Sequence, residues 1–180
     1  MTQGAQLYRG EIELADSDQD RYHSLSLSTP LHPSESLERL VLRLLAHLLL
    51  YQPGITFRDG GVSQGEEPDL AVRDATGRIS HWIEVGTPAE ERLRKANRHT
   101  QVSVVTHEGL LVRWQRQHKN QLPVFDGEIL ILEKEMVSAL TEQLARRFRW
   151  QATITGGTLY LENSGVSLTS SLRRIAAGRG

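Results

Sequence analysis

The chain has 180 residues, of which 38% are hydrophobic and 24% charged, enough apolar material for one compact domain over residues 1–180. It has no cysteine, which excludes a disulfide framework and thiolate metal sites. No apolar run reaches the length of a membrane span and the N-terminus does not resemble a signal peptide, so we expect a cytoplasmic protein with no membrane partner. The net charge of −1 means that any contact with nucleic acid must be local.

The N-terminal third is predicted to form a β-hairpin followed by a long helix. Apolar and polar side chains alternate over residues 6–14 and 22–28, which indicates two strands around the acidic loop 16–20. From Ser34 until just before Pro53, apolar residues recur at i, i+3, i+4, i+7 spacing. This spacing predicts an amphipathic helix with Ser34 as a candidate N-cap.

Two acidic residues, Glu35 and Glu38, fall in the first turns of this predicted helix, beside its apolar stripe. Acidic residues in a first turn usually stabilise the helix dipole, and this is our interpretation of Glu35. After the helix, residues 54–67 are predicted to be a loop rich in glycine and acidic residues, at the mouth of the site described next.

The most informative segment is a predicted hairpin that carries two carboxylates. Residues 69–72 form a short extended run, residues 74–77 are a turn signal, and residues 78–85 alternate into a second run. Residues equidistant from a tight turn face each other in an antiparallel hairpin. We therefore expect the carboxylate of Asp69 to lie close to that of Glu84.

Two converging carboxylates predict a divalent-metal site. They would repel each other unless a cation lay between them, and hard oxygen ligands suit Mg²⁺ or Mn²⁺. A carboxylate between Ile83 and Val85 is also costly to bury unless it is paired or metal-bound. The alternative is that Asp69 belongs to an ordinary acidic turn and that Glu84 points to solvent. The metal site would imply metal-assisted hydrolysis.

The second half of the chain continues the alternation of strands and helices. The predicted elements are a helix with Thr87 as its cap and Pro88 in its first turn, a strand over residues 101–106, a helical or extended segment through residue 114, a strand over 128–132, a helix over 133–148 and a hairpin of residues 150–155 and 158–161. Residues 164–180 are expected to be a peripheral C-terminal segment. This order of elements predicts an α/β protein with a mixed sheet flanked by helices.

Two basic clusters contain a tryptophan. Trp114 lies among the basic residues of segment 113–119, and Trp150 follows the arginines of segment 146–149. Either indole could stack on a base. An aromatic residue beside arginines is more often part of the core, and this is the interpretation that we favour.

Four motifs, in this order, resemble those of the YaeQ family of bacterial proteins. They are His32-Pro33-Ser34-Glu35-x-x-Glu38-Arg39, Glu67-Pro68-Asp69-Leu70, Trp82-Ile83-Glu84-Val85-Gly86-x-Pro88 and Arg92-x-Arg94-Lys95-Ala96. The resemblance extends over nearly the whole chain and is weakest after about Asn163. It implies membership of the PD-(D/E)xK nuclease-like superfamily. The implied fold is a restriction-endonuclease-like mixed β-sheet flanked by helices, with an N-terminal β-hairpin.

The superfamily pattern also implies roles for individual residues. It has an Asp at the end of one strand, a Glu and a Lys two residues apart on the next strand, and in some members a Glu from a preceding helix. Here Asp69 and Glu84 match the strand carboxylates, and Glu38 is placed as the helical one. These three residues are the implied ligands of Mg²⁺ or Mn²⁺. Gly86 stands where the lysine is expected.

A basic residue of the following helix could take the place of the missing lysine. Arg92 is favoured by geometry, because it lies nearer to the helix start than Lys95 does. Arg92 would stay protonated and clamp a phosphate, whereas only Lys95 could help to deprotonate water. The alternative is that both belong to a solvated basic face of the helix.

Two functions follow as expectations. The first is a Mg²⁺-dependent nuclease or phosphodiesterase acting on DNA or RNA, with Glu38, Asp69, Glu84 and either Arg92 or Lys95 as its catalytic residues. The second is a non-catalytic nucleic-acid-binding or transcription-associated accessory protein on a nuclease fold, favoured by Gly86 and by the nearly neutral net charge. A protein-interaction module with a vestigial site is a third interpretation. The sequence specifies neither the substrate nor the oligomeric state.

Overall fold

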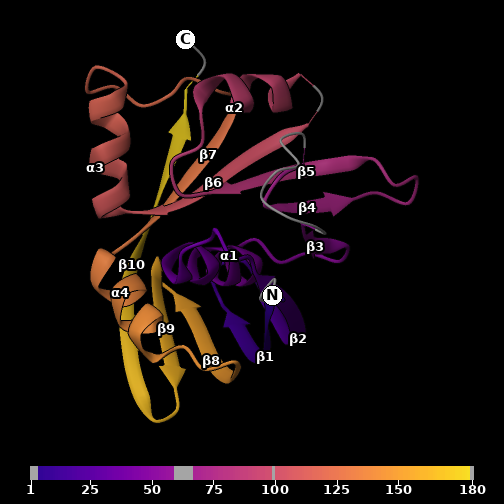
Figure 1. Cartoon of the computed structure of the whole chain (residues 1–180), viewed down its shortest axis with the longest axis vertical. Coiled ribbons are helices and arrows are strands. Elements are labelled where there is room, and N and C mark those ends of the chain that lie inside the picture. Colours follow the sequence, from indigo (N-terminus) through magenta and orange to yellow (C-terminus); the bar gives the residue numbers. More distant parts are fainter. Residues whose placement is uncertain (1–3, 59–66, 99, 179–180) are drawn as a thin grey trace.

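The structure is a computed structural model that describes residues 4–58, 67–98 and 100–178, and it has a mixed α/β architecture (Figure 1). Its elements in chain order are β1 (Gln6–Asp16), β2 (Arg21–Leu31), α1 (Leu37–Leu49), β3 (Ile55–Phe57), β4 (Leu70–Arg73), β5 (Ile79–Val85), α2 (Glu90–Asn97), β6 (Gln101–His107), α3 (Glu108–Gln117), β7 (Gly127–Leu132), α4 (Lys134–Gln143), β8 (Arg147–Thr155), β9 (Thr158–Asn163) and β10 (Val166–Ala177). In the described residues the strands form one ten-stranded sheet, in the order β2-β1-β8-β9-β10-β7-β6-β5-β4-β3.

The predicted N-terminal hairpin is present as the antiparallel pair β1 and β2, and it is longer than expected. The predicted hairpin of β8 and β9 is also confirmed. Gly156 and Gly157 form its two-residue turn with φ of +58° and +71°, a conformation that glycine adopts without strain. The helix predicted over residues 133–148 is too long, because α4 ends at Gln143 and β8 begins at Arg147.

Strand β10 joins the two halves of the sheet (Figure 1). Residues 166–171 pair antiparallel with β9, and residues 172–177 pair antiparallel with β7. The expectation of a peripheral C-terminal segment is therefore wrong. Most side chains of β10 are exposed or half-buried, so backbone hydrogen bonds rather than an apolar face hold the strand in the sheet.

The core has two parts, one on each face of β5, β6 and β7. Helix α1 packs against α4 and against β3 to β6, and every residue from Leu40 to Leu49 is buried. Helices α2 and α3 cover the other face with a smaller apolar cluster that includes Leu93 and Trp114. Strands buried on both faces suit the parallel pairing of β5, β6 and β7.

The tryptophans of the two basic clusters are both core residues, as we favoured from the sequence. Trp114 belongs to the smaller cluster and Trp150 to the larger one, and neither side chain is exposed. No helix among the described segments is both long enough and apolar enough to span a membrane.

The hairpin of β4 and β5 forms as predicted. The turn closes with the N–H of Gly77 donating to the carbonyl oxygen of Asp74 at 3.0 Å. Because β4 runs antiparallel to β5, the start of β4 lies at the same sheet edge as the ends of β5 and β6. The candidate site is built at this edge, beside the start of α1.

Candidate functional site

Asp69 and Glu84 lie side by side, as the sequence predicted. The strand ladder pairs Leu70 with Ile83, which brings the preceding Asp69 next to Glu84. The two carboxyl groups hydrogen-bond to each other, and their residues are only 1% and 3% exposed. The backbone N–H of Val85 donates a further hydrogen bond to Oδ2 of Asp69 at 2.9 Å. Glu84 therefore does not point to solvent.

The pair holds one proton at neutral pH. Burial and the charge of Asp69 raise the pKa of Glu84 to about 8. Burial acts to raise the pKa of Asp69 as well, but the charge of Arg39 and the hydrogen bonds that the carboxylate accepts lower this pKa below its ordinary value. Asp69 is thus ionised while Glu84 keeps its proton, and the pair carries a single negative charge.

Three arginines converge on the pair from three parts of the fold. Arg39 of α1 donates a hydrogen bond to Oδ1 of Asp69, and Nη2 of Arg58, which follows β3, lies 3.4 Å from the same oxygen. Nε of Arg92, on α2, donates to Oε1 of Glu84 at 2.6 Å. Guanidinium groups therefore occupy the positions in which the sequence analysis placed a metal ion.

Glu35 fixes this arrangement from the entry of α1. Its carboxylate accepts hydrogen bonds from Nε of Arg43 at 2.7 Å and from Nη1 of Arg39 at 3.3 Å. The helix begins after Ser36, whose Oγ accepts from the N–H of Arg39 at 3.2 Å. The assignments of Ser34 as cap and of Glu35 as a helix-dipole residue are therefore wrong, because the chain enters the helix two residues later than the pattern indicated.

Glu38 is in the first turn of α1, on the wall of a cavity that Glu84 also lines. Its Oε1 is 3.4 Å from Nε2 of His107, whose Nδ1 caps α3 by accepting from the N–H of Gly109 at 3.1 Å. Within the described parts of the chain, no three His, Cys, Asp or Glu side chains are grouped so that they could hold a metal ion. The three-carboxylate arrangement expected from the resemblance is not formed.

Gly86 stands where the resemblance implies a lysine, and its backbone conformation favours glycine. Strand β5 ends at Val85, and Gly86 has φ of +82°, in the left-handed region that favours glycine. The chain then leads to α2, which begins at Glu90 with Ala89 as its cap residue and no side-chain cap. The predicted cap at Thr87 is therefore wrong by two residues.

The structure separates the two basic candidates of α2. Arg92 contacts Glu84, as the argument from helix geometry favoured. Lys95 instead pairs with Glu91 at 3.3 Å, and its side chain is 70% exposed. A lysine placed in this way is not in the neighbourhood of the buried pair.

The site opens into a cavity of about 440 Å³ that we call the arginine cavity. Its lining includes Arg39, Arg58, Arg92 and Arg113. The acidic residues of the lining are Glu38 and Glu84, and Glu84 is protonated at neutral pH. Positive charge is therefore in excess, which suits an anion with several oxygens.

Two of the three arginines that contact the buried pair, Arg39 and Arg58, were absent from the sequence-based site. Arg39 is the last residue of the first family motif, and this was a usable signal. The spacing of residues in that motif does not distinguish Arg39 as a site residue. Arg58 follows β3, whose residues 55–57 lie within the segment that we predicted to be a loop. Residues 59–66 of that predicted loop lie outside the described residues. No local pattern indicates that Arg58 reaches Asp69.

Comparison with known proteins gives consistent matches. A family model described as YaeQ protein matches residues 1–172. YaeQ of Salmonella typhi is 30% identical over 171 residues, which cover 93% of this chain and 94% of that protein. The crystal structure of YaeQ from Xanthomonas axonopodis pv. citri matches with a TM-score of 0.87 at 30% identity, over 97% of this chain and 99% of that one. The structure of YaeQ from Pseudomonas syringae matches with a TM-score of 0.86 at 28% identity, over 99% and 100%.

Proposed function

The chain belongs to the YaeQ family, and for this member we propose that the arginine cavity binds a backbone phosphate of nucleic acid without cleaving it. The observation that carries the proposal is the convergence of Arg39, Arg58 and Arg92 on a buried acid pair that retains a proton. The proposal takes the mixed sheet to be of the nuclease-like kind that the sequence resemblance implies. A transcription-associated role stays a prediction.

The charges of the site support an anionic ligand. Asp69 carries one negative charge and is shared by Arg39 and Arg58, while Glu35 is shared by Arg39 and Arg43. The two carboxylates therefore position three guanidinium groups and leave one positive charge in excess. A guanidinium presents planar N–H donors that match the oxygens of a phosphate.

Binding of fluorescein-labelled DNA and RNA, measured by fluorescence anisotropy, tests the proposal. Arg113 is exposed on α3 and lines the cavity, whereas Arg116 is exposed one turn further along the same helix and is not part of the lining. We expect Arg113→Gln to weaken binding and Arg116→Gln to leave it unchanged. Equal affinities of the two variants, or no binding by the wild type, would contradict the proposal.

The second candidate function is the Mg²⁺-dependent phosphodiesterase expected from the sequence, and the adjacency of Asp69 and Glu84 favours it. As arranged, the pair does not fit a divalent ion, because guanidinium groups, the N–H of Val85 and the shared proton already engage its oxygens. We therefore derive no metal-dependent step from this geometry.

Calorimetric titration of Mg²⁺ and Mn²⁺ decides between the two functions. The wild type is compared with an Asp69→Ala, Glu84→Ala double variant that has been shown to be folded. Our proposal predicts no binding of either ion by the wild type. Binding that is lost in the double variant, together with metal-dependent cleavage of DNA or RNA, would replace the proposal by the phosphodiesterase.

A further inference from the structure

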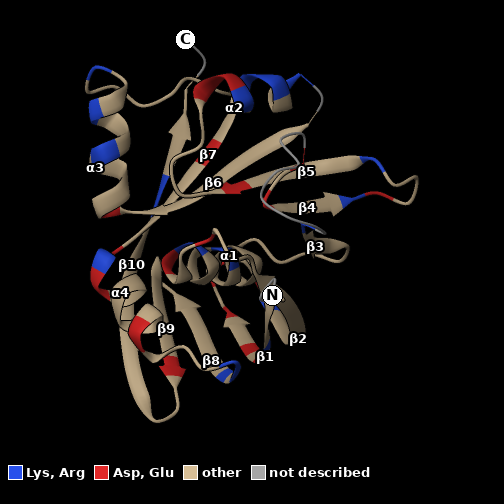
Figure 2. Cartoon of the chain, viewed as in Figure 1, with Lys and Arg blue, Asp and Glu red and all other residues tan. Residues whose placement is uncertain are grey.

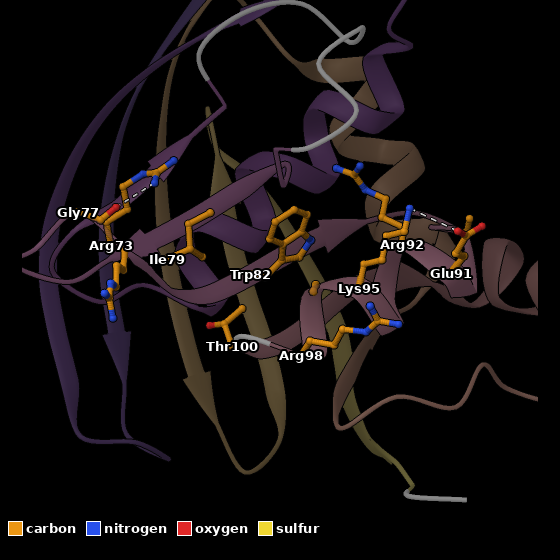
Figure 3. A pocket seen from close by; sticks show the side chains of 12 residues that line it. Arg73, Gly77, Ile79, Trp82, Glu91, Arg92, Lys95, Arg98 and Thr100 are labelled. Carbon is orange, nitrogen blue, oxygen red and sulfur yellow. Dashed lines mark hydrogen bonds and ion pairs between the residues drawn. The ribbon is translucent and has the colours of Figure 1, made fainter.

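We infer that the nucleic acid is single-stranded and that it leaves the arginine cavity along a basic groove between α2 and the β4–β5 hairpin (Figure 3). We call this depression the α2 groove. It is a hollow of about 970 Å³ and shares Arg92 with the arginine cavity. The inference rests on the proposed function, because it names the ligand class of the same site.

The α2 groove is strongly basic for a protein with a net charge of −1. The cationic residues of its lining are Arg73, Arg78, Arg92, Lys95 and Arg98. Among the described residues of the lining, Glu91 is the only acidic one. Figure 2 shows basic positions on α2 and at the end of the β4–β5 hairpin, the two elements that face each other across the groove. This local concentration of charge suits a polyanion.

Apart from Arg92, the cations of the groove form no ion pairs with described residues other than exposed ones, and they are available to a ligand. Lys95 pairs with Glu91 and Arg73 with Glu67, both between well-exposed side chains, and pairs of this kind contribute little free energy. Arg78 and Arg98 form no ion pair within the part of the chain that the structure describes. A phosphate can therefore engage this side of the groove without breaking a buried interaction.

Trp82 supplies an aromatic surface inside the groove. The side chain is half-buried and labelled at the centre of Figure 3. Its indole N–H donates to Oε1 of Glu84 at 2.7 Å, and the guanidinium carbon of Arg92 lies 5.4 Å from the ring centroid. The other two tryptophans, Trp114 and Trp150, are fully buried. Trp82 is thus the indole that a ligand can reach.

These features together favour a single strand over a duplex. A base can stack on the indole of Trp82 only if it is not stacked within a helix. Arg92 lines both hollows, and Trp82 of the groove donates a hydrogen bond to Glu84 of the arginine cavity, so one strand could place a base in the groove and the adjoining phosphate in the cavity. Basic grooves with an aromatic platform commonly bind single strands with little sequence preference.

The experiment combines tryptophan fluorescence with the salt dependence of binding to an oligothymidylate of about 20 nucleotides. We expect the oligonucleotide to quench the fluorescence of the wild type and not that of a Trp82→Phe variant. Removing Arg78 and Arg98 together, as Arg78→Gln, Arg98→Gln, should weaken binding. The slope of log K against log salt should then become shallower by about 0.7 for each arginine removed. Circular dichroism checks that every variant is folded.

A matched control removes one positive charge elsewhere. Arg149 lies on β8 with its side chain 76% exposed, paired to Glu11 at 2.8 Å, and Arg149→Gln should keep the wild-type affinity and slope. Unchanged binding by the Arg78, Arg98 double variant, with weaker binding by Arg113→Gln, would overturn the inference that the strand binds in the α2 groove. It would leave the proposal for the arginine cavity intact.

Three other outcomes are also decisive. Quenching that persists in Trp82→Phe would overturn the stacking role of the indole and with it the inference. Tighter binding of a duplex than of the single strand would overturn the choice of ligand. Failure of the wild type to bind any nucleic acid would overturn both the inference and the proposed function.

Discussion

The carboxyl group of Glu84 donates a hydrogen bond to the ionised carboxylate of Asp69 at the enclosed end of the β4–β5 hairpin. A buried acid of this kind keeps its proton because burial disfavours the carboxylate and because ionisation would place two negative charges in contact. The arginines around the pair neutralise the one charge that is present. The protonation state of the site is therefore coupled to the folding of the hairpin.

Folding stability is expected to fall as the pH rises from about 5 to about 8. The pKa of Glu84 is raised from its ordinary value of 4.5 to about 8, so in this window the folded protein holds a proton that the unfolded chain has lost. This stabilisation is complete below the pKa that Glu84 has in the unfolded chain, and it is lost as the pH rises through the pKa that Glu84 has in the folded protein. It decreases by roughly 1.4 kcal/mol per pH unit. Urea denaturation across this range measures it.

Glu84→Gln should remove this dependence, because glutamine does not titrate. Glu38→Gln is the matched control, since Glu38 lines the same cavity but is not part of the buried pair. It should retain the wild-type slope. A Glu84→Gln variant whose stability still declined over this pH range would show that another group is responsible.

Arg92→Gln is expected to raise the pKa of Glu84 further. The charge of Arg92 and its hydrogen bond to Oε1 both stabilise the ionised form, although burial and Asp69 outweigh them. Lys95→Gln serves as the control, because Lys95 pairs with Glu91 and is largely exposed. Titration of the carboxyl carbons by NMR measures both variants. An equal effect of the two substitutions would contradict the assignment of Arg92.

Restoring the expected lysine should destabilise the protein. Gly86 has φ of +82°, and a side chain in this conformation costs about 1–2 kcal/mol. Apart from its two chain neighbours, no heavy atom of the described residues lies within 4 Å of the position that a Cβ would occupy, so the cost arises from the backbone conformation. Gly86→Lys should therefore lower the free energy of unfolding in urea, and Gly86→Asn should lower it less. A Gly86→Lys variant as stable as the wild type would show that the loop relaxes.

Acid should also weaken the fold, through His47 on α1. Burial lowers the pKa of His47 from 6.5 to about 4, and its ring stacks on Phe57 with centroids 5.0 Å apart. The stabilisation by neutral His47 is present above the pKa of His47 in the unfolded chain, and it is lost as the pH falls through the pKa of His47 in the folded protein. His47→Phe retains an aromatic ring without a titrating group. The melting temperature, measured from pH 7 down to about pH 4, should fall less steeply for this variant than for the wild type.

Local patterns explain which parts of the fold were predictable. The hairpin over residues 69–85 has turn residues at its centre, a short extended run before them and alternation after them, so the adjacency of Asp69 and Glu84 followed from counting outward. Helix α1 was equally clear because its apolar spacing extends over several turns. The start of each helix was less certain, since Ser34 and Ser36 both suit a cap and only the observed geometry shows which one acts.

The sequence alone therefore determined the mixed α/β class, the carboxylate pair and the preference for Arg92 over Lys95. Only the tertiary structure decided that Arg39 and Arg58 also reach the pair, because they come from α1 and from the end of β3, and no short-range pattern records a contact between distant segments. It likewise decided the place of β10, which backbone pairing on both sides holds in the sheet without an apolar pattern in its side chains.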